Sequence, residues 1–523
     1  MTSEFSLRGV AGTSRRRTVD IEQALLDLDS DNDSDLDDLV GDDDGGWEDE
    51  TEDETEGGQV EGDGDTDGET HEQEGGGGEP QSKRKKRLKD RLVNTFENAL
   101  NPENYSEHKL PDEKKEYTVV IDKKTKDKPE VSITWQNYKR TRVGRQSREN
   151  IMNTASGVCG DARLADTPLK CFHLFFTESM ISTITKHTNE SIARYTWDTD
   201  RDTDSQANLT QSSKYTWVRL TDSVEMKAYI GLCYLRGLFQ QNNWDYKRIF
   251  ANMIGHPVFS ATMSANRFCF LNRHFSMDDA ETREERWQTD RLAACRDIHE
   301  EWNDNCSAAL QADDFMAIDE CLYACRNQIS IKQYNPNKPA KYGLLIKELN
   351  SVRVPYTHRS EVYAGKPVSE GPYYLKSVEE LTLRLVDKYS EFCEVQGRNI
   401  TVDNLYTSIS LAKKLLERGI TVVGTLRSNR KGIPKEVKDT AGREENSYMV
   451  LWDKESGKIT LHSFVVKTKS KGMKNITLLS THPPILGVTK DDTKFKPAIY
   501  KLYDFSKGNI DNIISTWELY FLF

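Results

Sequence analysis

The chain has 523 residues, of which 30% are charged and 36% hydrophobic, and its formal net charge is −13. This length exceeds one ordinary hydrophobic core, so several folded units are expected. No charge-free apolar run reaches the roughly 18 residues that a membrane span needs, and no signal-peptide core opens the chain. The nine cysteines form no paired framework. We therefore expect a protein with reduced thiols that neither crosses a membrane nor is secreted.

The acidic residues are concentrated near the N-terminus. Residues 20–79 contain 27 Asp or Glu and no Lys or Arg, and residues 1–81 hold too little apolar surface to offset the entropy of ordering. We expect 1–81 to be a disordered acidic tail, which either stays solvated or folds back and competes with a polyanion. From Pro80 onward, 68 Lys and Arg face 57 Asp and Glu, so this remainder is basic and suits a polyanionic partner.

Residues 82–164 are predicted to be a basic linker with short ordered pieces. The run at 83–87 reads Lys-Arg-Lys-Lys-Arg. Such a run is typical of a nuclear-import signal or a nucleic-acid patch, and almost as often of a solvated helix start. The β-branched stretch at 131–135 is an isolated strand signal within this linker.

Residues 165–314 carry the spacing of amphipathic helices. Phe172, Phe175 and Phe176, followed by Met180 and Ile184, recur at three- and four-residue intervals. Similar stretches lie at 224–239, 268–275 and 298–310. The pattern predicts a mainly helical domain.

From residue 315 the pattern changes to short β-branched strands that alternate with helices, which is typical of an α/β sheet domain. Helices are predicted at 378–389 and 408–418, the second closed by Gly419. The next strand is predicted at 420–426. We divide the remaining chain into a core over 315–430, a charged insertion over 431–474 with strands at 448–452 and 459–466, and a return over 475–523 with a strand at 476–480.

Two of the predicted strands end on an aspartate. Asp319 closes the apolar run 315–320, and Asp403 closes the run 399–404. A single aspartate in such a place is usually a turn or a helix cap. Two of them, with a third candidate at Asp511, instead suggest a rigid carboxylate cluster that holds a divalent metal.

A basic segment follows the first aspartate. Lys332, Tyr334, Lys338 and Lys341 are interleaved with prolines, as contact with a phosphate backbone beside an acidic centre would require. An ordinary basic loop is the alternative. Arg427, Arg430 and Lys431, which follow the strand at 420–426, are assigned to the same DNA-binding role.

At this point the chain resembles the piggyBac transposase family, over about residues 165–511. The family's first motif corresponds to Ile318-Asp319-Glu320 and the basic segment 333–343. Its second motif corresponds to Val402-Asp403-Asn404, followed by Tyr406, Thr407 and Ser408. The third motif, with Asp511 in the place of the third carboxylate, appears at 503–514. Several motifs in the same order are far more specific than any one alone.

The resemblance implies an α/β fold with a ribonuclease H-like catalytic core, interrupted by an inserted domain and flanked by helices for dimerisation and DNA binding. It implies Asp319, Asp403 and Asp511 as catalytic metal ligands for two Mg²⁺ ions, with Mn²⁺ as a substitute. It further implies a nuclear homodimer that cuts and joins DNA at transposon ends and TTAA targets.

The chain also departs from the family pattern. In the third motif, Asn509 replaces a glycine and Ile514 replaces an aspartate, and the family's further helices and zinc module do not follow Asp511. We therefore expect a C-terminally truncated member and keep two functions open: a DNA transposase, or an inactive derivative that binds DNA or chromatin. A nuclear interaction protein driven by the acidic tail is a weaker third hypothesis.

Overall fold

The fold was analysed in a computed structural model of the chain. The predicted acidic tail and the basic run at 83–87 lie outside the residues that the structure describes. Described are residues 101–518, with gaps at 123–129, 140–150, 202–214, 242–243, 252, 326, 337, 339, 366–368, 469–471, 484–485 and 490–495.

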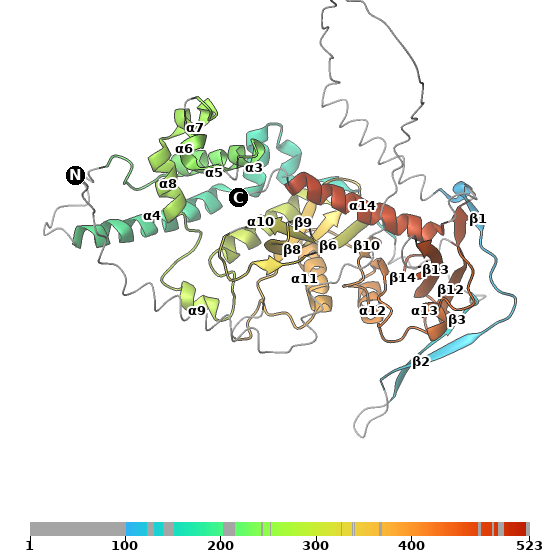
Figure 1. The fold of residues 1–523 in the computed structure, drawn as a ribbon. Helices are drawn as coiled ribbons and strands as arrows, with labels where there is room; N and C mark the ends of the chain where they lie inside the picture. The colour runs from blue at the N-terminus through green and yellow to red at the C-terminus, as the bar shows by residue number, and fades with distance from the viewer. Residues whose placement is uncertain are drawn as a thin grey trace, which may run out of the picture. The chain divides into compact units, whose positions relative to one another are not determined.

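A mixed sheet of 11 strands organises the described residues (Figure 1). Its strands follow one another in space as β2-β3-β12-β13-β14-β11-β10-β6-β8-β7, and β9 pairs with β8. Their bounds are β2 Glu116–Asp122, β3 Val131–Gln136, β6 Phe315–Ala324, β7 Gln333–Tyr334, β8 Tyr342–Ser351, β9 Thr357–Val362, β10 Asn399–Val402, β11 Thr421–Thr425, β12 Tyr448–Asp453, β13 Thr460–Thr468 and β14 Gly472–Ser480. Two small pairs stand apart: β1 Tyr105–Glu107 with β15 Gly487–Thr489, and β4 Gly157–Val158 with β5 Leu310–Gln311.

The centre of this sheet is parallel and its flanks are antiparallel. Strand β10 runs parallel to both β6 and β11, and the register pairs Val402 with Ile318 on one side and with Gly424 on the other. Gly424 is required there, because a Cβ would lie 2.2 Å from Thr407 Oγ1 and 2.7 Å from Val402 Cγ2. The three strands therefore begin at paired positions, and residues 319 and 403 follow directly paired residues, although β6 continues to Ala324 while β10 ends at Val402.

Helices cover both faces of this parallel centre. Helices α11 (Val378–Ser390) and α12 (Ile409–Glu417) pack on one face, in a core that includes Ile318, Val402 and Val422. Helix α14 (Ala498–Glu518) packs on the other face, against β6 and β10, in a core that includes Ala317 and Val423. Because side chains alternate along a strand, consecutive residues of β6 enter different cores.

Helix α12 ends as the sequence predicts. Gly419 has a φ of +71°, the left-handed conformation that glycine adopts without a steric cost. Its N–H donates to the carbonyl of Leu416 at 3.0 Å, and the N–H of Ile420 donates to the carbonyl of Leu415 at 2.9 Å. This cap turns the chain directly into β11.

Residues 168–309 form the helical region that the sequence predicts, with α4 and α5 packed on α8 around a core that contains Met180, Ile230 and Phe268. Helix α10 joins it to the edge of the large sheet, because Asn303 donates to the carbonyl of Ser360 and Arg359 on β9 pairs with Glu300 at 2.5 Å. The helices are α3 Pro168–Phe175, α4 Glu178–Arg201, α5 Ser223–Leu238, α6 Tyr246–Ile249, α7 Pro257–Thr262, α8 Ala265–His274, α9 Arg283–Trp287 and α10 Arg296–Ala309, with the 3-10 turns η2 Pro102–Asn104 and η4 Gly160–Leu164.

The large sheet also takes in two segments that the sequence analysis kept outside the core. The expected linker contains β2 and β3, and β3 pairs with β12, so this segment is part of the sheet instead of an isolated ordered piece. Trp135 anchors it, since this side chain is fully buried and its indole N–H donates to the carbonyl of Gly432 at 2.8 Å. The expected insertion contributes α13 (Lys435–Lys438), β12 and β13, which continue the same sheet through β14.

None of the helices in the described part of the chain has the length and apolarity that a membrane crossing requires.

Candidate active site

Asp319 and Asp403 lie side by side: Asp319 stands within β6, which continues to Ala324, and Asp403 directly follows the last residue of β10. Ile318 and Val402 are register partners, so the two aspartates are the next residues on strands that lie about 4.8 Å apart. Both side chains point to the α14 face, and Asp319 is only 6% exposed. The two sequence motifs thus meet at one place on the sheet, but the prediction that a strand ends at Asp319 is wrong, because β6 goes on pairing with β8 as far as Ala324.

Main-chain and hydroxyl donors fix the orientation of both carboxylates. Each accepts a hydrogen bond from the N–H of the following residue, at 2.8 Å for Asp319 and 2.5 Å for Asp403. Oδ1 of Asp403 also accepts from the hydroxyls of Thr425 on β11, at 3.2 Å, and Tyr503 on α14, at 3.5 Å. Since the donors come from a strand and a helix, the Asp403 carboxylate is held on several sides.

A lysine from α14 supplies positive charge to this pair. Nζ of Lys507 lies 3.4 Å from Oδ2 of Asp403. Burial raises the pKa of Asp319 above its usual value, and Lys507 opposes that effect, whereas the charges of Glu320 and Asp403 add to it. Burial works in the same direction on Asp403, but Lys507, the Asn404 N–H and Thr425 outweigh it and hold the pKa of Asp403 below its usual value.

The neighbouring Glu320 points to the opposite face of the sheet and has a different environment. Its Oε2 lies 3.2 Å from Nζ of Lys347, a side chain with no exposed surface, and accepts from the hydroxyl of Tyr406 at 2.9 Å. Burial works to raise the pKa of Glu320, yet Lys347, Lys338 and Tyr406 hold it below its usual value. This contact ties the first motif to the second, because Tyr406 follows Asp403 by three residues.

The third predicted ligand, Asp511, stands in α14 one turn after Lys507 and two turns after Tyr503. Its side chain lies outside the described residues. Within the described residues, no group of three or more His, Cys, Asp or Glu side chains is arranged as a metal site. The described part of the centre is therefore the pair Asp319 and Asp403, with Lys507.

Two of the predicted DNA-binding residues lie at this centre. Nε of Arg427 donates to Oδ1 of Asn404 at 3.1 Å, and Arg430 donates to the carbonyl of Leu405 at 2.7 Å. Both guanidinium groups thus pack against the loop that carries Asp403. Lys431 is exposed just beyond them.

The basic segment lies next to the first motif. Nζ of Lys338 donates to the carbonyl of Glu320 at 3.5 Å. The ring of Tyr334, which is 51% exposed, lies 4.6 Å from the ring of Tyr342, and Nζ of Lys332 lies 5.9 Å from the centre of the Tyr342 ring. Lys341 has a φ of +55° at the end of the loop. The structure therefore brings Lys338 to the centre and keeps the other three on the neighbouring surface.

Sequence reasoning missed several residues of the centre. Lys507, Tyr503 and Thr425 contact Asp403, but none was a candidate, and Lys347 was missed behind Glu320. Lys507 and Tyr503 had a usable signal, because they precede Asp511 by four and eight residues and fall on one side of a helix with 3.6 residues per turn.

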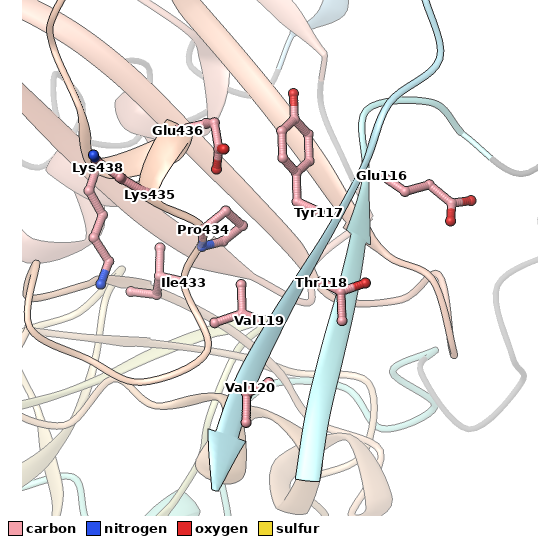
Figure 2. A pocket seen from close by; sticks show the side chains of 10 residues that line it. All are labelled: Glu116, Tyr117, Thr118, Val119, Val120, Ile433, Pro434, Lys435, Glu436 and Lys438. Carbon is pink, nitrogen blue, oxygen red and sulfur yellow. The ribbon is translucent and has the colours of Figure 1, made fainter. Parts of the chain in front are cut away.

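A groove of about 670 Å³ lies elsewhere, between β2 and residues 433–438 (Figure 2). Tyr117, Val119 and Pro434 give it apolar walls, and Lys435 and Glu436 add charges of both signs. It includes neither aspartate of the centre.

Comparison with known proteins identifies the class and then the family. A family model described as "Transposase IS4" matches residues 167–521, which is more than half of the chain. Human PiggyBac transposable element-derived protein 2 is 23% identical over 367 residues, covering 66% of this chain and 55% of that protein. A cryo-EM structure of a piggyBac transposase synaptic complex with hairpin DNA matches with a TM-score of 0.60 and 28% identity, over 70% of this chain and 71% of the other.

The match to the family model places the chain among the transposases. The chain belongs to the piggyBac transposase family, as the resemblance in the motifs predicted. It spans 55% of the length of the human relative.

Proposed function

We propose that the chain is a DNA strand transferase whose carboxylates Asp319, Asp403 and Asp511 hold Mg²⁺ at the site of phosphodiester cleavage. One observation carries this proposal: β6 and the end of β10 bring two carboxylates to the same face of the sheet, Asp319 buried and Asp403 15% exposed. Two like charges close together in a buried place destabilise a fold, so a purely structural role does not explain this arrangement.

The strand order supports a ribonuclease H-like core for this site. Strands β9, β8 and β6 are successive antiparallel neighbours, and β10 and β11 then add in parallel. In this interpretation, the helices of residues 168–309 flank the core, β12 and β13 belong to an insertion that follows the second carboxylate, and β14 returns the chain to the core.

The residues present fit divalent metal. Carboxylate oxygens are the ligands that Mg²⁺ prefers, and Mn²⁺ accepts the same donors. When bound, two such ions activate the attacking hydroxyl and stabilise the leaving oxygen of a phosphoryl transfer. The charge on Asp403 is already favoured, because donors and Lys507 lower its pKa.

The other residues of the centre then have separate roles. The Asn404 N–H and the Thr425 hydroxyl orient Asp403. Arg427 and Arg430 lie beside the same loop, where guanidinium groups can bind DNA phosphates. The segment with Lys332, Tyr334, Lys338 and Lys341, together with Lys431, extends this basic surface along the DNA.

The family and the structural relative support a proposal for the substrate. The structural relative is a piggyBac transposase in a synaptic complex with hairpin DNA. We propose that this chain likewise acts on transposon ends and TTAA targets, as a homodimer in the nucleus.

Incubation of the purified full chain with TTAA-containing plasmid DNA and Mg²⁺ or Mn²⁺ tests the proposal. Nicks that map to TTAA sites are expected. Asp403→Asn should reduce nicking more than about a hundredfold, because loss of a residue that merely supports a metal ligand already costs 10–100-fold.

Asp387→Asn is the matched control. Asp387 is an exposed aspartate on α11, paired with Arg418 at 2.7 Å, so its variant should nick DNA like the original chain. Equal nicking by Asp403→Asn and Asp387→Asn, with both variants folded, contradicts the assignment of the centre.

A second candidate function rests on the third motif, where Ile514 replaces an acid of the family pattern. In this alternative the chain binds DNA or chromatin and does not cut. It predicts DNA binding that weakens steeply with salt, and no metal-dependent nicking under any condition in which the chain binds DNA.

A further inference from the structure

The two oxygens of the Asp403 carboxylate have different partners. Oδ1 faces three neutral donors: the Asn404 N–H and the hydroxyls of Thr425 and Tyr503. Oδ2 faces the ammonium of Lys507, 3.4 Å away. The neutral donors orient the carboxylate, so its second oxygen is directed at a positive charge.

The positive charge of Lys507 also acts on the carboxylate of Asp319. Among the groups that act on Asp319, its charge is the strongest influence against the effect of burial, and the same holds for Asp403. One ammonium thus compensates two carboxylates that repel each other. Lys507 belongs to a helix, whereas Asp319 lies within β6 and Asp403 directly follows β10.

The position of Lys507 coincides with the place that a divalent cation would take. Coordination by Oδ2 of Asp403 would bring the cation next to the ammonium, and two positive charges at such a distance repel strongly in a buried site. The Lys507 side chain is 30% exposed, and its four-carbon stem is flexible. It can therefore leave the carboxylates by changing its side-chain rotamers.

We propose that Lys507 is a built-in cation that holds Asp319 and Asp403 together before metal binds, and that a divalent cation displaces it. This inference rests on the proposed metal site. Lys507 is then a positioning residue that keeps the two carboxylates in place before metal binds. It also lowers the metal affinity, because it competes with the metal for the same carboxylates.

Mn²⁺ binding to the full chain without DNA tests this competition, with free Mn²⁺ followed by electron paramagnetic resonance. Lys507→Met should bind Mn²⁺ at least about fivefold more tightly than the original chain, because the competing charge is gone. Lys507→Arg keeps a charge and should bind no more tightly than the original. Equal or weaker binding by Lys507→Met overturns the inference.

Two controls separate a local effect from a general one. Lys388→Met removes the cation of an exposed pair, Lys388 with Glu391 at 3.2 Å, and should leave Mn²⁺ affinity unchanged. If Lys507→Met does not fold, Lys507→Gln replaces it, since it also removes the charge and retains polarity. The melting temperature of each variant identifies the folded ones.

Asp403→Asn distinguishes failure of the inference from failure of the proposed function. Mn²⁺ binding that depends on Asp403, but does not tighten in Lys507→Met, contradicts only the role of Lys507. If neither the original chain nor Lys507→Met binds Mn²⁺ in an Asp403-dependent way, the metal site and the inference both fail. Tighter binding in Lys507→Met that Asp403→Asn abolishes supports both.

Discussion

Two consecutive residues of β6, Asp319 and Glu320, place acids on opposite faces of the same sheet and meet very different surroundings. Glu320 faces Lys347, which has no exposed surface, and a tyrosine hydroxyl. Asp319 faces a second acid and shares a partly exposed lysine with it. The opposite pKa shifts follow, because Glu320 is stabilised in its charged form and Asp319 is not.

The difference teaches how a buried acid becomes a structural residue or a reactive one. An acid with its own buried cation and a hydrogen bond has satisfied partners and holds elements together. An acid that shares one cation with a second acid keeps negative charge that this cation does not fully compensate. The acid on the α11 and α12 face thus has its own cation, whereas the two acids on the α14 face share the charge of Lys507.

Removal of Lys347 should have the largest effect on this comparison. Lys347→Met leaves the Glu320 charge buried without its cation, which typically costs about 3–5 kcal/mol of unfolding free energy. Denaturant titration of the variant and the original chain measures the loss.

Lys388→Met provides the comparison for that loss. Its ion pair with Glu391 has the same length, 3.2 Å, but both side chains are about half exposed. Such surface pairs contribute about 0–1 kcal/mol. Similar losses in the two variants would show that the Glu320 pair is not the buried structural element described above.

Acidification should weaken both faces of the sheet. Burial lowers the pKa of His358, which packs 4.7 Å from the Tyr389 ring on the α11 face, and of His462 on the α14 face, each to about 3. The unfolded chain takes up a proton at each histidine near pH 6.5, which the folded chain cannot do. Stability is therefore complete above pH 6.5 and falls below it, by about 2 kcal/mol per histidine at pH 5.0.

The free energy of unfolding at pH 7.5 and pH 5.0 checks this effect. His462→Gln should reduce the difference between the two pH values by about 2 kcal/mol. An unaltered pH dependence in His462→Gln would mean that this part of the α14 face admits water.

The sequence predicted the local elements well and the contacts between distant elements poorly. Helices at 378–389 and 408–418, the strand before Asp403 and the start of the strand that contains Asp319 were expected, because their periodicity and caps depend on a few neighbouring residues. The continuation of β6 to Ala324 was not expected. The pairing of β3 with β12 was not expected, because residues 131–135 have the pattern of an isolated strand. The group that Trp135 binds, the carbonyl of Gly432, lies nearly three hundred residues later in the chain.

The same limit applies to the site. Asp319 and Asp403 were predicted to meet because each was expected to end a strand. They do follow directly paired residues, although β6 continues beyond Asp319. Lys507 and Lys347 could not be assigned in this way. Helical spacing places Lys507 on the side of α14 that carries Asp511, but only the packing of α14 and β8 shows that Lys507 and Lys347 face Asp403 and Glu320.

Neutralising Asp319 and Glu320 one at a time should change the unfolding free energy least, and the two changes should differ clearly. Asp319→Asn removes a charge that burial disfavours, and its amide oxygen can still accept from the Glu320 N–H, so the unfolding free energy should stay within about 1 kcal/mol of the original and should not fall. Glu320→Gln removes a charge that its partners favour and should cost about 1.5–3 kcal/mol. Urea titrations of both variants at pH 7.5 measure the two changes.

Because these side chains are neighbours on one strand, the contrast isolates the surroundings from the position. A loss of stability in Asp319→Asn equal to that in Glu320→Gln would mean that Asp319 is also a structural acid. Loss of nicking without loss of stability would instead mean that the charge of Asp319 is needed for function and does not stabilise the fold.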